Sequence, residues 1–114
     1  MEKNYILQDM IKKRVAVICR SSGDVVKLSE LVEALYPGFG SRIICYKKSA
    51  DSKEYGGEIA IRLEEYHGSL DYGWDRPSYY KRRGFVVVNL FELDCDFGEF
   101  ETNDMGMNGL LFGG

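Results

Sequence analysis

The segment from Val25 to Leu35 limits the fold more than any other part of the chain. Its apolar residues recur at the spacing of one helix face, and Pro37 and Gly38 end the pattern. The run RVAVICR precedes it and is apolar on both faces of a strand, which is typical of a central position in a sheet. The pair therefore predicts a buried strand followed by an amphipathic helix.

The other segments extend this pattern into the order α-β-α-β-β-α-β. Helical periodicity or capping residues mark two more helices, and apolar or alternating runs mark three more strands. We expect helices over 4–12 and 74–84, strands over 42–48, 58–66 and 85–93, and loops over 49–57 and 67–73. The sequence thus predicts a single small α+β domain with a four-stranded, mostly antiparallel sheet and helices packed on one face.

Without its first helix, this order matches that of ferredoxin-like folds, which is one topology it allows. The fourth strand fits poorly there, because it is apolar on both faces although that topology makes it an edge. We expect it either to lie more centrally or to be covered by the N-terminal helix, the C-terminal tail or a second copy of the chain. The predicted division is a domain over 1–93 and an acidic, glycine-rich tail over 94–114, with Leu110, Leu111 and Phe112 packing on the sheet.

Composition excludes several classes of protein. The chain has 114 residues, enough for a core that needs no disulfide, and its net charge of −3 does not suggest a protein that coats DNA. Its three cysteines form no CxxC pair, so we expect buried reduced thiols and a cytoplasmic location. No apolar run is long enough for a signal peptide or a membrane span.

One segment combines aromatic and basic residues, WDRPSYYKRRGF. Its rings could stack on bases while its cations neutralise phosphates, which makes it a candidate nucleic-acid surface. The alternative is structural, with the rings in the core and the cations balancing a helix dipole. The candidate partner-binding residues of this segment are Trp74, Arg76, Tyr79, Tyr80, Lys81, Arg82 and Arg83.

A second segment, from Glu92 to Asp104, has six acids and no base. Its spacing does not fit an EF-hand, because Glu99 occupies the position of the glycine and Met105 that of the last ligand. An acidic strip with aromatics could bind a basic protein surface, and the alternative is a solvated loop. The candidate residues are Asp94, Asp96, Glu99, Phe100, Glu101 and Asp104.

Catalytic signals are weak, and we expect no enzyme, metal or cofactor. His67 is the only histidine, and nothing in the spacing pairs it with a cysteine. The sequence therefore favours a small non-enzymatic protein that binds another macromolecule. A protein is the favoured partner, and the chain would then be an adaptor or inhibitor encoded by a phage or mobile element. Nucleic-acid binding through residues 74–83 is the first alternative, and a carrier protein with a reactive Gly113–Gly114 end is the second. The sequence also allows a homodimer.

Overall fold

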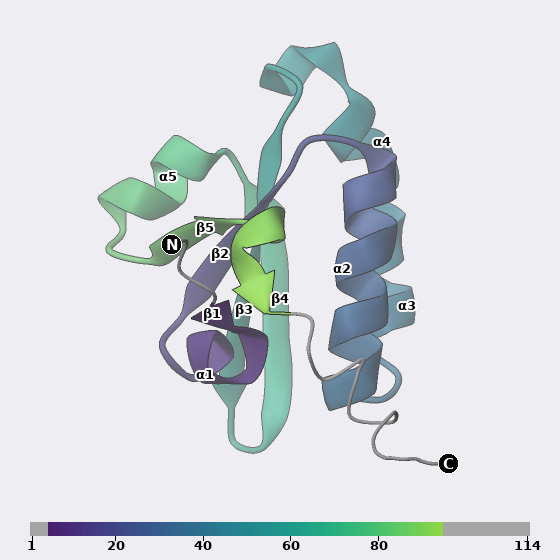
Figure 1. Cartoon of the computed structure of the whole chain (residues 1–114). Coiled ribbons are helices and arrows are strands. Elements are labelled where there is room, and N and C mark those ends of the chain that lie inside the picture. Colours follow the sequence, from purple (N-terminus) through teal and green to yellow (C-terminus); the bar gives the residue numbers. More distant parts are fainter. Residues whose placement is uncertain (1–4, 95–114) are drawn as a thin grey trace.

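The computed structural model describes residues 5–94, which form one four-stranded mixed sheet with helices on both faces (Figure 1). The strand order across the sheet is β4-β3-β2-β5. The α+β class and the number of strands in the sheet are therefore as predicted. The strands are β2 (Val15–Cys19), β3 (Ile59–Tyr66), β4 (Ser69–Asp75) and β5 (Val86–Asn89).

The pairing of these strands is mostly antiparallel, as expected. Strand β3 runs antiparallel to both β2 and β4, while β5 runs parallel to β2. The order is not the ferredoxin-like one, because the first two strands of the sheet, β2 and β3, are direct neighbours. Strands β4 and β5 occupy opposite edges, so the chain between them, which includes α5 (Pro77–Arg82), connects one edge of the sheet to the other.

Helices cover both faces of the sheet, which corrects the prediction of helices on one face. The large core lies between one face and α1 (Leu7–Lys12), α2 (Ser22–Leu35), α3 (Gly40–Ile43) and α4 (Lys47–Asp51). Helix α5 packs on the other face through Tyr80, which contacts Ala16 and Ala60. These two alanines leave room for a tyrosine ring close to the sheet, and this explains why a strand apolar on both faces lies beneath it.

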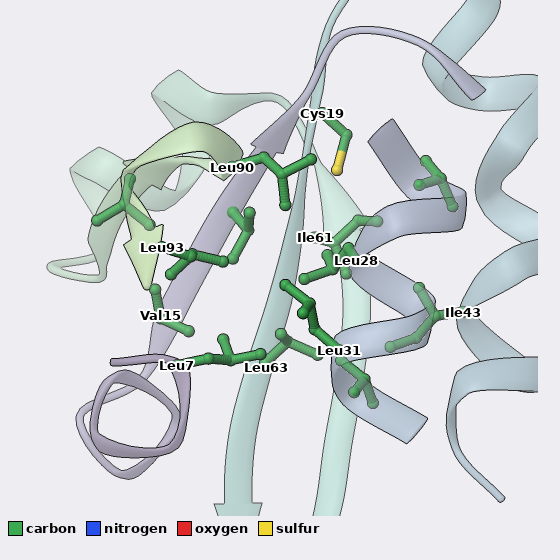
Figure 2. Close-up of a cluster of buried hydrophobic side chains, with 14 of the residues drawn as sticks. Leu7, Val15, Cys19, Leu28, Leu31, Ile43, Ile61, Leu63, Leu90 and Leu93 are labelled. Atoms are coloured by element: carbon green, nitrogen blue, oxygen red, sulfur yellow. The ribbon is translucent and has the colours of Figure 1, made fainter. Parts of the chain in front are cut away.

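The large core joins segments from the whole described chain (Figure 2). Its largest members are fully buried, and each such side chain contributes about 1.5–3 kcal/mol on burial. Helix α2 supplies one wall, and the hydroxyl of its N-cap residue Ser21 accepts a hydrogen bond from the Asp24 amide at 3.3 Å. The residues labelled in Figure 2 are Leu7, Val15, Cys19, Leu28, Leu31, Ile43, Ile61, Leu63, Leu90 and Leu93.

The segment 42–48, predicted as a strand, is helical instead. It spans the end of α3, the 3₁₀ turn η1 (Ile44–Tyr46) and the start of α4, and the predicted loop after it continues α4 into the 3₁₀ turn η2 (Lys53–Tyr55). The carboxylate of Glu33 accepts hydrogen bonds from the amides of Gly38 and Gly40 at 2.8 and 2.9 Å, which anchors the start of this segment on α2. The β-forming composition of the segment is overridden by this packing.

The segment 67–73, predicted as a loop, forms most of β4. Strands β3 and β4 pair from Tyr66↔Ser69 outward, so only His67 and Gly68 form the turn, with φ of 52° and 78°. Positive φ at both positions is the signature of a type I′ hairpin turn. The predicted helix over 74–84 is confirmed only as the shorter α5, because Trp74 and Asp75 still belong to β4.

Strand β5 is an edge strand, yet both of its faces are covered. Val88 joins the large core and Val87 packs against the small cluster around Tyr80. The chain then forms the 3₁₀ turn η3 (Leu90–Glu92) and β6 (Leu93–Asp94), which pairs in parallel with β1 (Tyr5–Ile6). Helix α1 packs in the large core on the same face as Val88, so the N-terminal helix is one of the expected covers; Leu110, Leu111 and Phe112 lie outside the described residues.

The two described cysteines differ in environment. Cys19 is fully buried, and burial, with a smaller contribution from Asp24, raises the pKa of its thiol to about 12. Cys45 is exposed, which corrects the expectation of a buried thiol, because its segment is helical and the residue faces away from the core. Both are free thiols.

Candidate nucleic-acid interface

The sheet separates the aromatic residues of segment 74–83 into two groups. Trp74 lies opposite Ile61 in β3 and packs against the large core, where its ring meets that of Tyr55 at 4.9 Å between centroids. The Arg76 guanidinium lies 6.0 Å from the Tyr55 ring centre. Trp74 and Arg76 thus belong to an aromatic cluster with Tyr55, apart from the tyrosines of α5.

The two tyrosines of α5 pack on the opposite face of the sheet. Tyr80 is 4% exposed, so its ring has no free face on which a base could stack. Tyr79 is half-buried, and the Arg83 guanidinium lies 4.8 Å above its ring. Burial raises the pKa of the Tyr80 hydroxyl, although the Arg62 cation beside it acts in the opposite direction. The aromatic residues of α5 therefore hold the helix and its arginine in place.

The topology brings a second basic segment next to the first. The parallel strands β2 and β5 enter the sheet from the same end, and the Arg14 carbonyl accepts a hydrogen bond from the Val86 amide at 3.2 Å. Each strand is preceded by a helix with a basic end, α1 on the face of the large core and α5 on the other face. We name the resulting patch the basic surface, formed by Lys12, Lys13, Arg14, Lys81, Arg82 and Arg83.

The cations of the basic surface are exposed and mostly without acidic neighbours. Within residues 5–94, Arg14 is the only one of the six in an ion pair, with its Nε 3.3 Å from Glu64. The Arg14 guanidinium also lies 4.4 Å from the centre of the Phe85 ring. Arg14 itself has φ of 66°, an uncommon value for a residue with a side chain. The other five cations are available to an external anion.

Arg62, a half-buried arginine on β3, links the basic surface to the hairpin of β3 and β4. Arg62 on β3 donates from Nη1 to Glu64 at 2.8 Å and to Asp71 at 2.7 Å, and from Nη2 to the Tyr72 carbonyl at 2.9 Å. Burial opposes the charge of Arg62, but the two carboxylates outweigh it and raise the pKa of the guanidinium. The side chain crosses Gly73, where a Cβ would lie 3.0 Å from Nη2. Arg62 thereby satisfies an edge carbonyl of β4 and organises the charges beneath α5.

An apolar hollow of about 330 Å³ lies elsewhere, at the end of β2. Its apolar lining includes Ile18, Leu90 and Phe91, and its polar lining consists of Arg20, Asp24 and Lys27. Phe91 is 76% exposed, a larger fraction than that of any other large hydrophobic side chain among residues 5–94. An exposed aromatic ring beside an apolar hollow is typical of a contact surface for another molecule.

Most of the other candidate residues predicted from the sequence lie outside the part of the chain that the structure describes. The tail residues Asp96, Glu99, Phe100, Glu101 and Asp104 lie outside it, as do Gly113 and Gly114, and of Asp94 only the backbone is described. In residues 5–94, no group of three or more His, Cys, Asp or Glu side chains is arranged to hold a metal ion. His67 contacts the Tyr66 ring in the hairpin turn. No helix in this part of the chain is long and apolar enough to cross a membrane.

Comparison of the chain with models of protein families, with curated proteins and with solved structures gives no match. The functional argument therefore depends on the geometry of the surface alone. Sequence reasoning identified one half of the basic surface and missed Lys12, Lys13 and Arg14, which it attributed to the end of a helix. The signal available was the presence of two basic triplets, each directly before an apolar strand, and parallel pairing of those strands was needed to join them.

Proposed function

We propose that this chain is a non-enzymatic protein that binds nucleic acid through the basic surface, mainly by contacts with the phosphate backbone. The observation that carries the proposal is the convergence at one end of the sheet of two basic triplets, Lys12–Arg14 and Lys81–Arg83, with 66 residues of chain between them. Clustered lysines and arginines on one face are the usual footprint of a nucleic-acid-binding protein. The net charge of −3 does not oppose this, because the last twenty residues hold four acids and no base.

A purely structural role accounts for only part of this charge. Cations at the ends of α1 and α5 stabilise the helix dipoles, but each helix end carries about half a negative charge. Two ends therefore balance about one of the six cations, and Glu64 pairs with another. The excess of about four positive charges supports an external polyanion as the partner.

The test measures fluorescence anisotropy of labelled single-stranded and duplex oligonucleotides at two salt concentrations. Five unpaired cations predict a slope of log K against log salt of about −4.5 for duplex and −3.5 for single strands, so raising salt from about 50 to 200 mM weakens duplex binding about 500-fold. A variant with Lys81, Arg82 and Arg83 changed to Gln should lose most of this binding. Absence of salt-dependent binding by the wild-type chain at low salt would refute the proposal.

The matched control carries the same change in charge elsewhere. Lys47, Lys48 and Lys53 lie on or next to α4, which packs on α2 on the opposite face of the sheet from α5. Their replacement by Gln lowers the net charge by three units, as in the test variant. Equal loss of binding in both variants would mean that total charge rather than the basic surface determines affinity.

A protein partner is the second candidate, and one observation supports it. Phe91 is exposed beside the apolar hollow, a combination suited to an apolar side chain of a protein partner. Replacement of Phe91 by Ser should remove a partner captured from the native host without affecting oligonucleotide binding. Retention of every captured partner by this variant would exclude the hollow as the contact.

A further inference from the structure

A polar hollow of about 410 Å³ lies between α5 and the sheet, directly beside the basic surface. Arg14 and Arg83 both line it, so each basic triplet contributes one residue. Arg62 and Glu64 reach it from β3, and Asp75 from the end of β4. It is therefore the one described hollow to which both halves of the basic surface contribute a side chain.

Aromatic rings hold the two outer arginines of this hollow. The guanidinium of Arg14 lies 4.4 Å from the Phe85 ring centre, and that of Arg83 lies 4.8 Å from the Tyr79 ring centre. A guanidinium that packs on a ring keeps the N–H groups at its edge free, and these match the oxygens of a phosphate in pairs. Arg14 is fixed further by its left-handed backbone and by the hydrogen bond from the Val86 amide. Arg83 thus keeps its whole N–H edge for an anion, whereas Arg14 offers its two Nη groups, because its Nε pairs with Glu64.

Of the three arginines that line the hollow, one has no ion-pair partner among residues 5–94. Arg62 is occupied by Glu64 and Asp71, and Glu64 also pairs with Arg14 at 3.3 Å. The Asp75 carboxylate accepts a hydrogen bond from the Arg76 amide at 2.7 Å. Arg83 has no carboxylate within ion-pair distance among residues 5–94. Arg83 is therefore the arginine of this hollow whose guanidinium is left to bind an external anion.

We infer that this hollow binds a single phosphate group, with Arg83 as the principal donor and Arg14 as the second. The inference rests on the proposed function and deepens it, because it assigns one phosphate of the nucleic acid to a defined position, while the other cations act by general attraction. A phosphodiester within the strand and a phosphomonoester at its end present the same oxygens. Oligonucleotides with and without a 5′-phosphate distinguish these two sources. Tighter binding of the phosphorylated strand would identify the terminal phosphate as the group in the hollow.

The decisive comparison uses two neighbouring arginines of equal charge. Arg83→Gln removes the principal donor, whereas Arg82→Gln removes an exposed cation that does not line the hollow. At about 0.1 M salt, we expect oligonucleotide affinity to fall about five- to eightfold for Arg82→Gln, the loss of one phosphate contact, and at least about thirtyfold for Arg83→Gln. Arg83→Lys should behave like Arg83→Gln, because lysine keeps the charge but has no paired N–H edge.

A second measurement examines the hollow without nucleic acid. Titration of the wild-type chain with inorganic phosphate should shift the Nε–H resonances of Arg83 and Arg14 in NMR spectra, and Arg83→Gln should lose the shift of Arg14. Unshifted resonances, or equal effects of the changes at Arg82 and Arg83, would overturn the phosphate site. Salt-dependent binding by the wild type would then leave the proposed function intact, whereas its absence would refute that function separately.

Discussion

Neutralising Lys12 and Lys13 tests whether the two basic triplets act as one surface. Both residues are exposed, and neither has a carboxylate partner among residues 5–94. Changing both to Gln should reduce the salt slope by about 1.8 for duplex and about 1.4 for single strands, because each phosphate contact contributes about 0.9 or 0.7 to it. At about 0.1 M salt, this corresponds to affinity losses of about 60-fold and 25-fold, if contacts other than ionic ones are unchanged.

The assay is fluorescence anisotropy at several salt concentrations, with the midpoint of urea unfolding as a check on folding. Combining this double variant with the Gln triple variant at 81–83 should add the two reductions in slope, since all five cations face one polyanion. The reasoning would be refuted by a double variant that keeps the wild-type slope while the triple variant loses it. In that case α5 alone would contact nucleic acid, and the convergence at β2 and β5 would have no role in binding.

Three further predictions concern the fold and its thiols. Gly40→Ala should lower the free energy of unfolding by roughly 1–3 kcal/mol in urea titrations, because the new Cβ would lie 2.5 Å from a carbonyl of α2. Gly73→Ala should cost less than about 1 kcal/mol, because the atom it meets is the far end of the long Arg62 side chain, which has to shift only slightly. At pH 8, iodoacetamide should modify Cys45 well before Cys19, as measured by peptide mass spectrometry, because a pKa of about 12 leaves Cys19 almost without thiolate.

Each of these three predictions has an outcome that would contradict it. Unchanged stability of Gly40→Ala would mean that α2 and α3 separate easily, contrary to their close backbone contact. A large destabilisation by Gly73→Ala would show that the Arg62 network is rigid. Modification of Cys19 at the rate of Cys45 would indicate frequent opening of the large core, since the thiol has no other route to the reagent.

Periodicity predicted the segments whose burial pattern is simple. Strand β2 is buried at all five positions, and α2 has a single apolar face. The sequence pattern of the first therefore indicates only a central strand, and that of the second only an amphipathic helix. The segment 42–48 was misread because its isoleucines and tyrosine favour strands locally. The helical signal was present over a longer window, as Phe39, Ile43, Tyr46 and Ala50 recur at intervals of three and four and all contact the large core.

The hairpin was missed for a different physical reason. A His–Gly pair is a weaker turn signal than Asn–Gly, although His67 adopts the same positive φ. The alternation of Leu70, Tyr72 and Trp74 after it was the second indication of a strand. Because this segment was interpreted as a loop, Trp74 was assigned to the helix that follows and grouped with the tyrosines of α5. In the structure, Trp74 and these tyrosines lie on opposite faces of the sheet.

The basic surface depends on topology, which no local pattern contains. Helices end with cations because their carbonyl ends are negative, so Lys12–Arg14 and Lys81–Arg83 each have a local explanation. The two ends become neighbours only because the connection containing α5 leads from the β4 edge to the β5 edge, which places β5 parallel to β2. Parallel neighbours begin at the same end of a sheet, so the helices that precede them also end there. A strand order with β5 elsewhere would separate the triplets and leave each with only its local role.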